Sequence, residues 1–311
     1  MVEHLGEPDA GRVIDATGCL KKGTKSVGVA RQYSGTAGRL EHCQSGVLLT
    51  DATGRGRTCL DRELYRPREW ATDPDRRAVA GVPEAVPFAT KPRLARQMIA
   101  RALAVGVPCG WVTGDSVDGS DWRLRSWLEE QQLSSVLGGT AQYRSFTGRT
   151  RAWAAAVLGR LAPDVWRRLS CGAGSQGERR YDWVRLPLGA PRAERPRWLL
   201  ARRSLSHPTQ MAYDVGSGPP DTSREPLVRA VGTRWAIEES FETATGEVGL
   251  NHYEVRSWPG WYRHLTLALC AHADLTVLRA AAVVPLQATP KKCGDRRPSC
   301  RSRGVDSPDS A

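Results

Sequence analysis

Three acidic residues stand out because each follows, or lies within, an apolar segment that is typical of regular secondary structure. Asp15 ends a short run of β-branched residues, Asp115 follows the apolar run 109–113, and Glu238 lies much further along, in a segment with helical spacing. Carboxylates that meet at the edge of a sheet can hold two Mg²⁺ or Mn²⁺ ions about 4 Å apart. One ion activates a water molecule or a 3′-hydroxyl group and the other stabilises the leaving oxygen, which is the chemistry of phosphodiester cleavage.

Spacing alone does not select these three residues. The chain has 33 acidic residues, and most strand-end aspartates cap turns or helices. Glu239 is the rival of Glu238, although it faces about 100° away on a helix. Asp118 and Asp121 follow Asp115 closely and could distort the site or partly substitute for it, and for Asp118 we favour a turn before Gly119.

Basic residues indicate a polyanionic partner. The 311 residues include 45 Lys and Arg, so the formal net charge is +12, and such a surface releases counterions when it meets phosphates. An arginine-rich codon usage is the competing explanation of the charge. Lys21, Lys22, Lys25 and Arg31 follow the first aspartate, and we favour phosphate contact over a solvated turn for them. Four tryptophans, at positions 153, 166, 258 and 261, could stack on unpaired bases, but core packing is the favoured role.

The elements that must position these residues alternate between strands and helices. Predicted strands cover 12–16, 25–32, 44–50, 58–61, 109–113, 135–137, 181–188 and 198–203, and predicted helices cover 91–105, 122–132, 225–245 and 262–278. The helix between the strands at 109–113 and 135–137 implies that these two strands pair in parallel, so the fold class is α/β. The glycine-rich stretch 170–180 is predicted to be a flexible loop, and the chain from 287 onward lacks periodicity and reads as a disordered basic tail.

Longer stretches of the sequence resemble the DDE transposases of bacterial insertion sequences, a branch of the DDE-superfamily endonucleases. The resemblance covers roughly residues 1–283. It is carried by VIDATGCLKKGTKSVGVARQYSGTAGRLEHCQ, LDRELYRPREW, VPFATKPRLARQMIARAL, WLLARRSLSHPT and RWAIEESFETATGEVGLNHYEVRSWPGWYRHLTLALCAHA.

This resemblance implies an RNase H-like mixed sheet flanked by helices. The first part of the core would cover 1–138, an inserted region rich in strands 139–222, the helical part with the last catalytic residue 223–283, and the basic tail 284–311. It implies that Asp15, Asp115 and Glu238 are the metal ligands and that two Mg²⁺ or Mn²⁺ ions serve cleavage and strand transfer. The implied partners are the terminal inverted repeats and target DNA, bound by a homodimer.

Related transposases carry the signature Tyr-x2-Arg-x3-Glu-x6-Lys in the last catalytic helix. Arg234 and Glu238 match it and share one helical face, where the arginine can reach a phosphate beside the carboxylate. Val231 stands in place of the tyrosine and Thr245 in place of the lysine. Around the second aspartate, where the family has Asp-Glu-x-Tyr-Gly, this chain reads DSVDG, with Ser116 and Asp118 at the changed positions.

Three hypotheses follow: an active transposase, a degenerate remnant that binds DNA without catalysis, or a related RNase H-like nuclease with no role in transposition. The short stretch before Asp15 suggests truncation at the N-terminus relative to the family. The N-terminus lacks a signal-peptide pattern, and there is no run of about twenty apolar residues. We therefore expect a cytoplasmic protein without a membrane partner.

Overall fold

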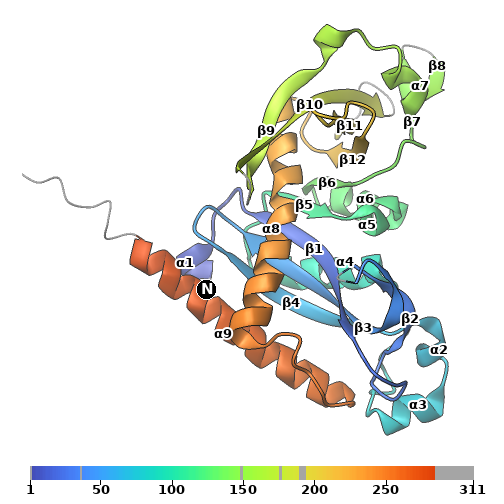
Figure 1. Ribbon diagram of the computed structural model, residues 1–311, viewed down its shortest axis with the longest axis vertical. Coiled ribbons are helices and arrows are strands. Elements are labelled where there is room, and N and C mark those ends of the chain that lie inside the picture. Colours follow the sequence, from blue (N-terminus) through green and yellow to red (C-terminus); the bar gives the residue numbers. More distant parts are fainter. Residues whose placement is uncertain (1, 36, 148–149, 175–176, 189–193, 284–311) are drawn as a thin grey trace, which may run out of the picture.

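The computed structural model describes residues 2–35, 37–147, 150–174, 177–188 and 194–283. Its centre is a mixed sheet of ten strands (Figure 1). These strands are β1 (Gly11–Leu20), β2 (Ala30–Ser34), β3 (Arg39–Ala52), β4 (Arg57–Tyr65), β5 (Trp111–Gly114), β6 (Ser134–Gly138), β9 (Arg167–Gly174), β10 (Gly177–Leu188), β11 (Arg197–Arg203) and β12 (Met211–Ser217). The short strands β7 (Arg144–Thr147) and β8 (Thr150–Trp153) pair with each other. The predicted tail at 284–311 lies outside the described residues.

The sheet has the strand order of an RNase H-like core at one end. Strands β4, β3 and β1 are antiparallel neighbours. Strand β5 then pairs in parallel with β1 and with β6, which confirms the parallel pairing predicted from the intervening helix. Beyond β6, the strands β12, β11, β10 and β9 continue the same sheet as antiparallel neighbours. The fold is therefore mixed α/β and RNase H-like, as expected.

Helices cover both faces of the sheet. The longer ones are α4 (Lys91–Ala104), α6 (Trp122–Glu130), α8 (Arg224–Val248) and α9 (Trp258–Val283), and the short ones are α1 (Val2–Leu5), α2 (Arg68–Ala71), α3 (Pro74–Val79), α5 (Ser116–Ser120) and α7 (Ala154–Leu158). Side chains of a strand alternate between the two faces of the sheet, so consecutive residues of β1 contact helices on opposite faces. Ile14 packs in one core cluster with Met98 of α4 and Leu128 of α6. Val13 packs with Ile237 of α8 on the other face.

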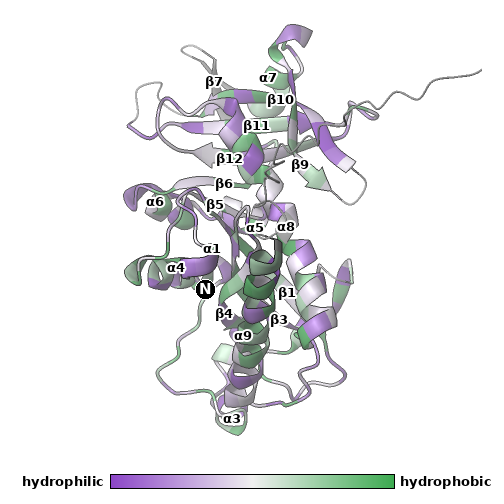
Figure 2. Ribbon diagram, turned by 90° about the vertical axis from the view of Figure 1, so that its left-hand side faces the viewer, coloured by the Kyte–Doolittle hydropathy of each residue, from purple (hydrophilic) through white to green (hydrophobic). Residues whose placement is uncertain are grey.

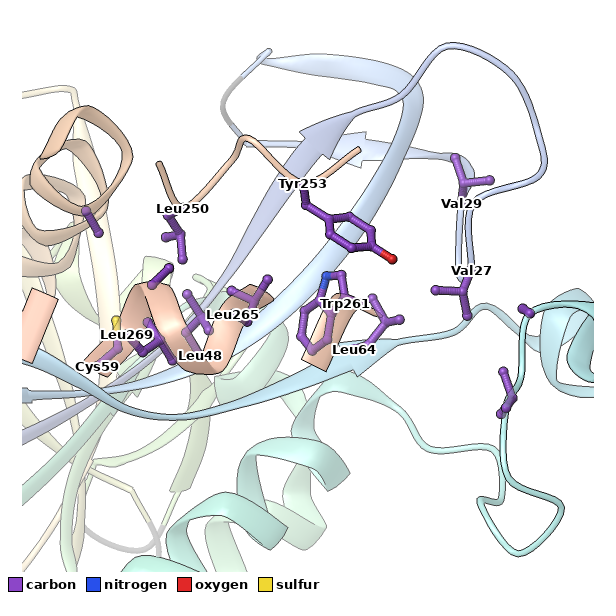
Figure 3. Close-up of a cluster of buried hydrophobic side chains, with 14 of the residues drawn as sticks. Val27, Val29, Leu48, Cys59, Leu64, Leu250, Tyr253, Trp261, Leu265 and Leu269 are labelled. Atoms are coloured by element: carbon purple, nitrogen blue, oxygen red, sulfur yellow. The ribbon is translucent and has the colours of Figure 1, made fainter. Parts of the chain in front are cut away.

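Helix α9 closes a second part of the core. Its residues Trp261, Leu265 and Leu269 are buried together with Leu48 of β3 and Leu64 of β4 (Figure 3). Among the described helices, α9 is the one with the length and apolar composition of a membrane-spanning segment. Figure 2 shows, however, that hydrophilic residues are distributed along it, and its apolar side packs on the sheet as in a core helix.

Three tryptophans support the predicted packing role. Trp261 is buried, and Trp258 and Trp166 pack against core clusters. Trp153 differs because it is 51 % exposed.

Two strand predictions were wrong in detail. Most of the stretch predicted as a flexible loop belongs to β9 and β10, which pair from Trp183 opposite Arg167 to Gly177 opposite Gly174. Its glycines removed the alternation by which a strand is recognised, whereas the partner strand supplies the backbone hydrogen bonds. The strand predicted at 25–32 begins at Ala30 instead, because Gly28 has φ +74° and lies against the Tyr65 carbonyl. Strand β12 was not predicted.

Candidate active site

The register between β1 and β5 brings the first two predicted aspartates together. The strands are parallel, with Val13 opposite Thr113. Two residues further along each chain, Asp15 therefore lies beside Asp115, which comes directly after the end of β5. Residues that are 100 positions apart in sequence thus occupy one row of the sheet.

Helix α8 crosses one face of the sheet over β1 (Figure 1). Val13 packs on Ile237 of α8, and Asp15, two residues later, is on the same face of β1. Glu238 is next to Ile237 on the helix and is exposed. The third predicted carboxylate therefore approaches the pair from the helix above the sheet.

The charged groups that act on Asp15 include the other two predicted carboxylates. The pKa of Asp15 is raised to about 6, mainly by burial and further by the negative charges of Asp115 and Glu238. The Ala16 N–H, which donates to Asp15 Oδ1 at 2.7 Å, and the Arg234 guanidinium oppose this rise. Besides burial, Asp15 is thus influenced by two further carboxylates and one guanidinium group.

The carboxylates do not converge on a single point. Asp115 Oδ1 accepts hydrogen bonds from the backbone N–H groups of Val117 at 2.7 Å and Asp118 at 3.2 Å, so it caps α5. Within the described part of the chain, no three His, Cys, Asp or Glu side chains are grouped closely enough to hold a metal ion. The donor chemistry suits Mg²⁺ or Mn²⁺, but joint coordination requires side chains such as Asp115 to rotate.

Asp118 is a fourth acidic group at this site, and the turn role favoured for it was wrong. It lies within α5, is 4 % exposed, and its pKa is raised well above the ordinary value by burial and by Asp115 and Asp15. Helix α5 is pressed onto the end of β6, since a Cβ on Gly119 would lie 1.8 Å from the Gly138 carbonyl oxygen. This close approach, which sequence periodicity does not reveal, turns Asp118 inward.

The two rival acidic residues have other partners. Glu239 forms an ion pair with Arg57 of β4 and lies 4.0 Å from Arg179 of β10. Asp121 caps α6 by accepting hydrogen bonds from the N–H groups of Arg123 and Leu124. Both engagements favour Glu238 as the third ligand.

The predicted DNA-binding residues lie in two places. Arg234 is on α8 beside the carboxylates, and its Nε is buried without a hydrogen-bond partner among the described residues. Lys21 is about 20 Å along the strand direction from Asp15, donates to the Tyr253 carbonyl oxygen and lies 5.2 Å from that ring. The remaining members of this group, Lys22, Lys25 and Arg31, are exposed.

Sequence reasoning missed Asp214, because β12 was not predicted. The register from β5 through β6 to β12 pairs Gly114 with Leu137 and Gly138 with Asp214, so Asp214 extends the row of Asp115. Burial raises its pKa to about 6, while Arg202 and Arg234 oppose the rise. Arg234 therefore acts electrostatically on both Asp15 and Asp214.

Comparisons with known proteins identify the family of the chain. Residues 1–185 match the sequence profile of a family described as DDE superfamily endonuclease. Over 252 residues, or 79 % of this chain, the sequence is 23 % identical to a "Probable transposase for insertion sequence element IS701" from Microchaete diplosiphon. The match spans 60 % of the length of that relative. The profile match includes Asp15 and Asp115 and ends before Glu238.

Proposed function

Because the chain belongs to the DDE superfamily endonucleases, we propose that it is the catalytic part of a transposase that cleaves DNA at the ends of an insertion sequence and joins them to target DNA. The observation that carries the proposal is the alignment of Asp15 on β1 with Asp115 directly after the parallel strand β5, with Glu238 on helix α8. The similarity to a transposase supports the same function.

Members of this family generally use divalent metal ions. In this chain Asp15, Asp115 and Glu238 would hold two Mg²⁺ or Mn²⁺ ions, which would activate the attacking oxygen and stabilise the leaving oxygen. Arg234 is placed to donate to the phosphate beside these carboxylates, through the strong hydrogen bonds that guanidinium groups form with phosphate oxygens.

The proposed reaction has two displacements at phosphorus. Water attacks the phosphorus at the element's end, the bond to the 3′ oxygen breaks, and the element is left with a 3′-hydroxyl. That hydroxyl then attacks a phosphorus of the target, forms a new phosphodiester and releases the target's own 3′-hydroxyl. Charge accumulates on the phosphate oxygens in both steps, which is where Arg234 would act.

Two neighbouring glutamates provide a matched test. The purified protein should cleave DNA carrying the repeats that flank its gene when Mg²⁺ or Mn²⁺ is added. Asp15→Ala and Glu238→Gln should abolish cleavage, whereas Glu239→Gln, one residue away but paired with Arg57, should retain most of it. Cleavage by Asp15→Ala at the rate of the unchanged protein would refute the assignment.

A second candidate function is DNA binding without cleavage. It is favoured by the lack of convergence among the described carboxylates and by the buried Asp118 that adds a fourth acid beside Asp15. Under this hypothesis the protein binds DNA in a salt-sensitive manner but cuts no substrate with any divalent metal.

The assembly is part of the proposal. We place the catalytic core in 1–138 and 223–283, with 139–222 as the insertion, and expect a cytoplasmic protein that acts as a homodimer, since two element ends must be held together. Light scattering on the DNA complex should give two chains per pair of ends.

A further inference from the structure

Arginines surround a hollow at the end of the sheet opposite to β4. It has a volume of about 530 Å³ and is lined by Arg167 and Arg168 of β9, Arg185 of β10 and Arg224 at the start of α8. Glu225 is the acidic residue of its lining. Four arginines from three elements therefore contribute to its lining.

Strand register explains why Arg167, Arg185 and Arg224 meet, whereas Arg168, opposite Asp182, extends from the other face of the sheet. Arg167 is opposite Trp183 on the neighbouring strand, and Trp183 packs in the core cluster beneath α8. Arg185, two residues after Trp183, is on the same face. This face is also where α8 begins, with Arg224 as its first residue.

Protein groups balance only part of this charge. Arg168 forms an ion pair with Asp182 at 3.1 Å. Arg224 donates to the Val165 carbonyl oxygen at 3.4 Å, and Arg185 donates to a backbone carbonyl and lies 5.0 Å from the Trp198 ring. These neutral partners orient the guanidinium groups without neutralising them, and Glu225 offsets only part of their charge.

The pKa of Arg185 reflects its closeness to other positive charges. Its pKa is lowered by burial and then by the positive charge of Arg224, with Glu225 opposing the shift. An anion in the hollow would relieve this repulsion. Phosphate suits the planar donors of arginine particularly well.

We propose that this hollow binds backbone phosphates of the DNA substrate, at a place separate from the carboxylates. The inference rests on the proposed function for the identity of the polyanion. Arg224 and Glu238 are fourteen residues apart on α8, which corresponds to about 20 Å of helix. A duplex that reaches both places must extend about six base pairs beyond the scissile phosphate. Since phosphates carry no sequence information, the contact adds affinity and orientation but no base preference.

The test compares two double variants with equal loss of charge. Arg167→Gln with Arg224→Gln removes two arginines of the hollow. The matched control, Arg55→Gln with Arg279→Gln, removes two arginines that pair with Glu7 and Glu247 elsewhere on the surface. Binding to a duplex of about 20 base pairs is measured by fluorescence anisotropy from about 50 to 200 mM salt.

The hollow variant should bind about 10–60-fold more weakly at 0.1 M salt, because each lost phosphate contact removes up to about eightfold from counterion release. Its plot of log affinity against log salt should be shallower by up to about 1.8. The control should keep the affinity and slope of the unchanged protein. Hollow variants with unchanged affinity and slope would overturn the inference.

A second measurement needs no substitution. DNA should protect Arg167 and Arg224 from modification by phenylglyoxal, mapped by mass spectrometry, and should leave Arg55 and Arg279 reactive. Equal reactivity of Arg167 and Arg224 with and without DNA would contradict the proposal. The two proposals fail separately. If the hollow variant loses affinity for DNA but the unchanged protein shows no metal-dependent cleavage, the phosphate site stands and the transposase activity is refuted. If the unchanged protein cleaves DNA and the hollow variant binds DNA with unchanged affinity, the transposase activity stands and the phosphate site is refuted.

Discussion

Replacing Asp15 with asparagine should stabilise the metal-free protein while removing its activity. Asp15 is partly buried among Asp115, Asp118 and Glu238, so its negative charge is unfavourable in the folded state. Asparagine has the same shape and can still accept the hydrogen bond from the Ala16 N–H. The substitution therefore removes the repulsion without removing a local contact.

The pKa of Asp15 sets the size of this effect. It rises from 3.8 to about 6, a change of roughly two units, and each unit corresponds to about 1.4 kcal/mol. The upper limit is about 3 kcal/mol, and partial exposure of the side chain to solvent reduces the expected gain to about 1–2 kcal/mol.

The sign of the pH dependence follows from the same shift. Because the pKa of Asp15 is higher in the folded state, the folded protein binds more protons than the unfolded chain between about pH 4 and 6. Asp15 therefore lowers stability progressively as the pH rises through this window. The advantage of Asp15→Asn should be absent near pH 4 and complete above about pH 7.

Urea denaturation in EDTA at several pH values measures the free energy of unfolding for both proteins. Asp75→Asn, an exposed position on α3, is the control and should change stability by less than about 0.5 kcal/mol. Adding Mg²⁺ should then stabilise the unchanged protein more than Asp15→Asn. An Asp15→Asn protein that is less stable at pH 8, or whose advantage does not depend on pH, would refute this account of the site.

Two further substitutions test the packing that holds the site. Asp51→Ala should lower the free energy of unfolding by about 3–5 kcal/mol, because the buried Arg12 of β1 loses its ion-pair partner. Urea denaturation measures this loss, and a value below about 1 kcal/mol would contradict the role of the pair. Gly232→Ala should lower the free energy of unfolding by about 1–3 kcal/mol, since its Cβ would lie 1.7 Å from the Cys171 carbonyl oxygen. The control is Gly246→Ala on the same helix, where a Cβ meets no atom within 4 Å. This variant should raise the free energy of unfolding by up to about 1 kcal/mol. Equal thermal shifts for the two glycine variants would show that α8 does not pack on β9 this closely.

Much of the core could be predicted from local patterns. The apolar spacing in 91–105 and 225–245 predicted α4 and α8 to within a few residues, because one buried helical face imposes its own period. The prediction of the glycine-rich β9 and of β12 failed for the converse reason. Their backbone hydrogen bonds come from partner strands, and their residues lack a clear alternation.

For the candidate site, sequence resemblance suggested Asp15, Asp115 and Glu238, and their activity stays a prediction. Asp214 was not recognised as a neighbour of that site, and Asp118 was considered there but assigned to a turn. Asp118 turns inward because α5 meets β6 with only glycines between the backbones, and Asp214 joins the row through two strand pairings. Neither contact leaves a signal in the residues adjacent to these aspartates.

Sequence alone was sufficient for the basic charge, the positions of the main helices and the short strands that end on acids, because these properties depend on composition and on neighbours a few residues away. Tertiary structure was needed to find the alignment of Asp15 with Asp115, the ion-pair and hydrogen-bond partners of Glu239 and Asp121, and the arginine hollow. Each of these depends on the register between segments far apart in the chain, where a shift of one residue would turn the side chains to the other face.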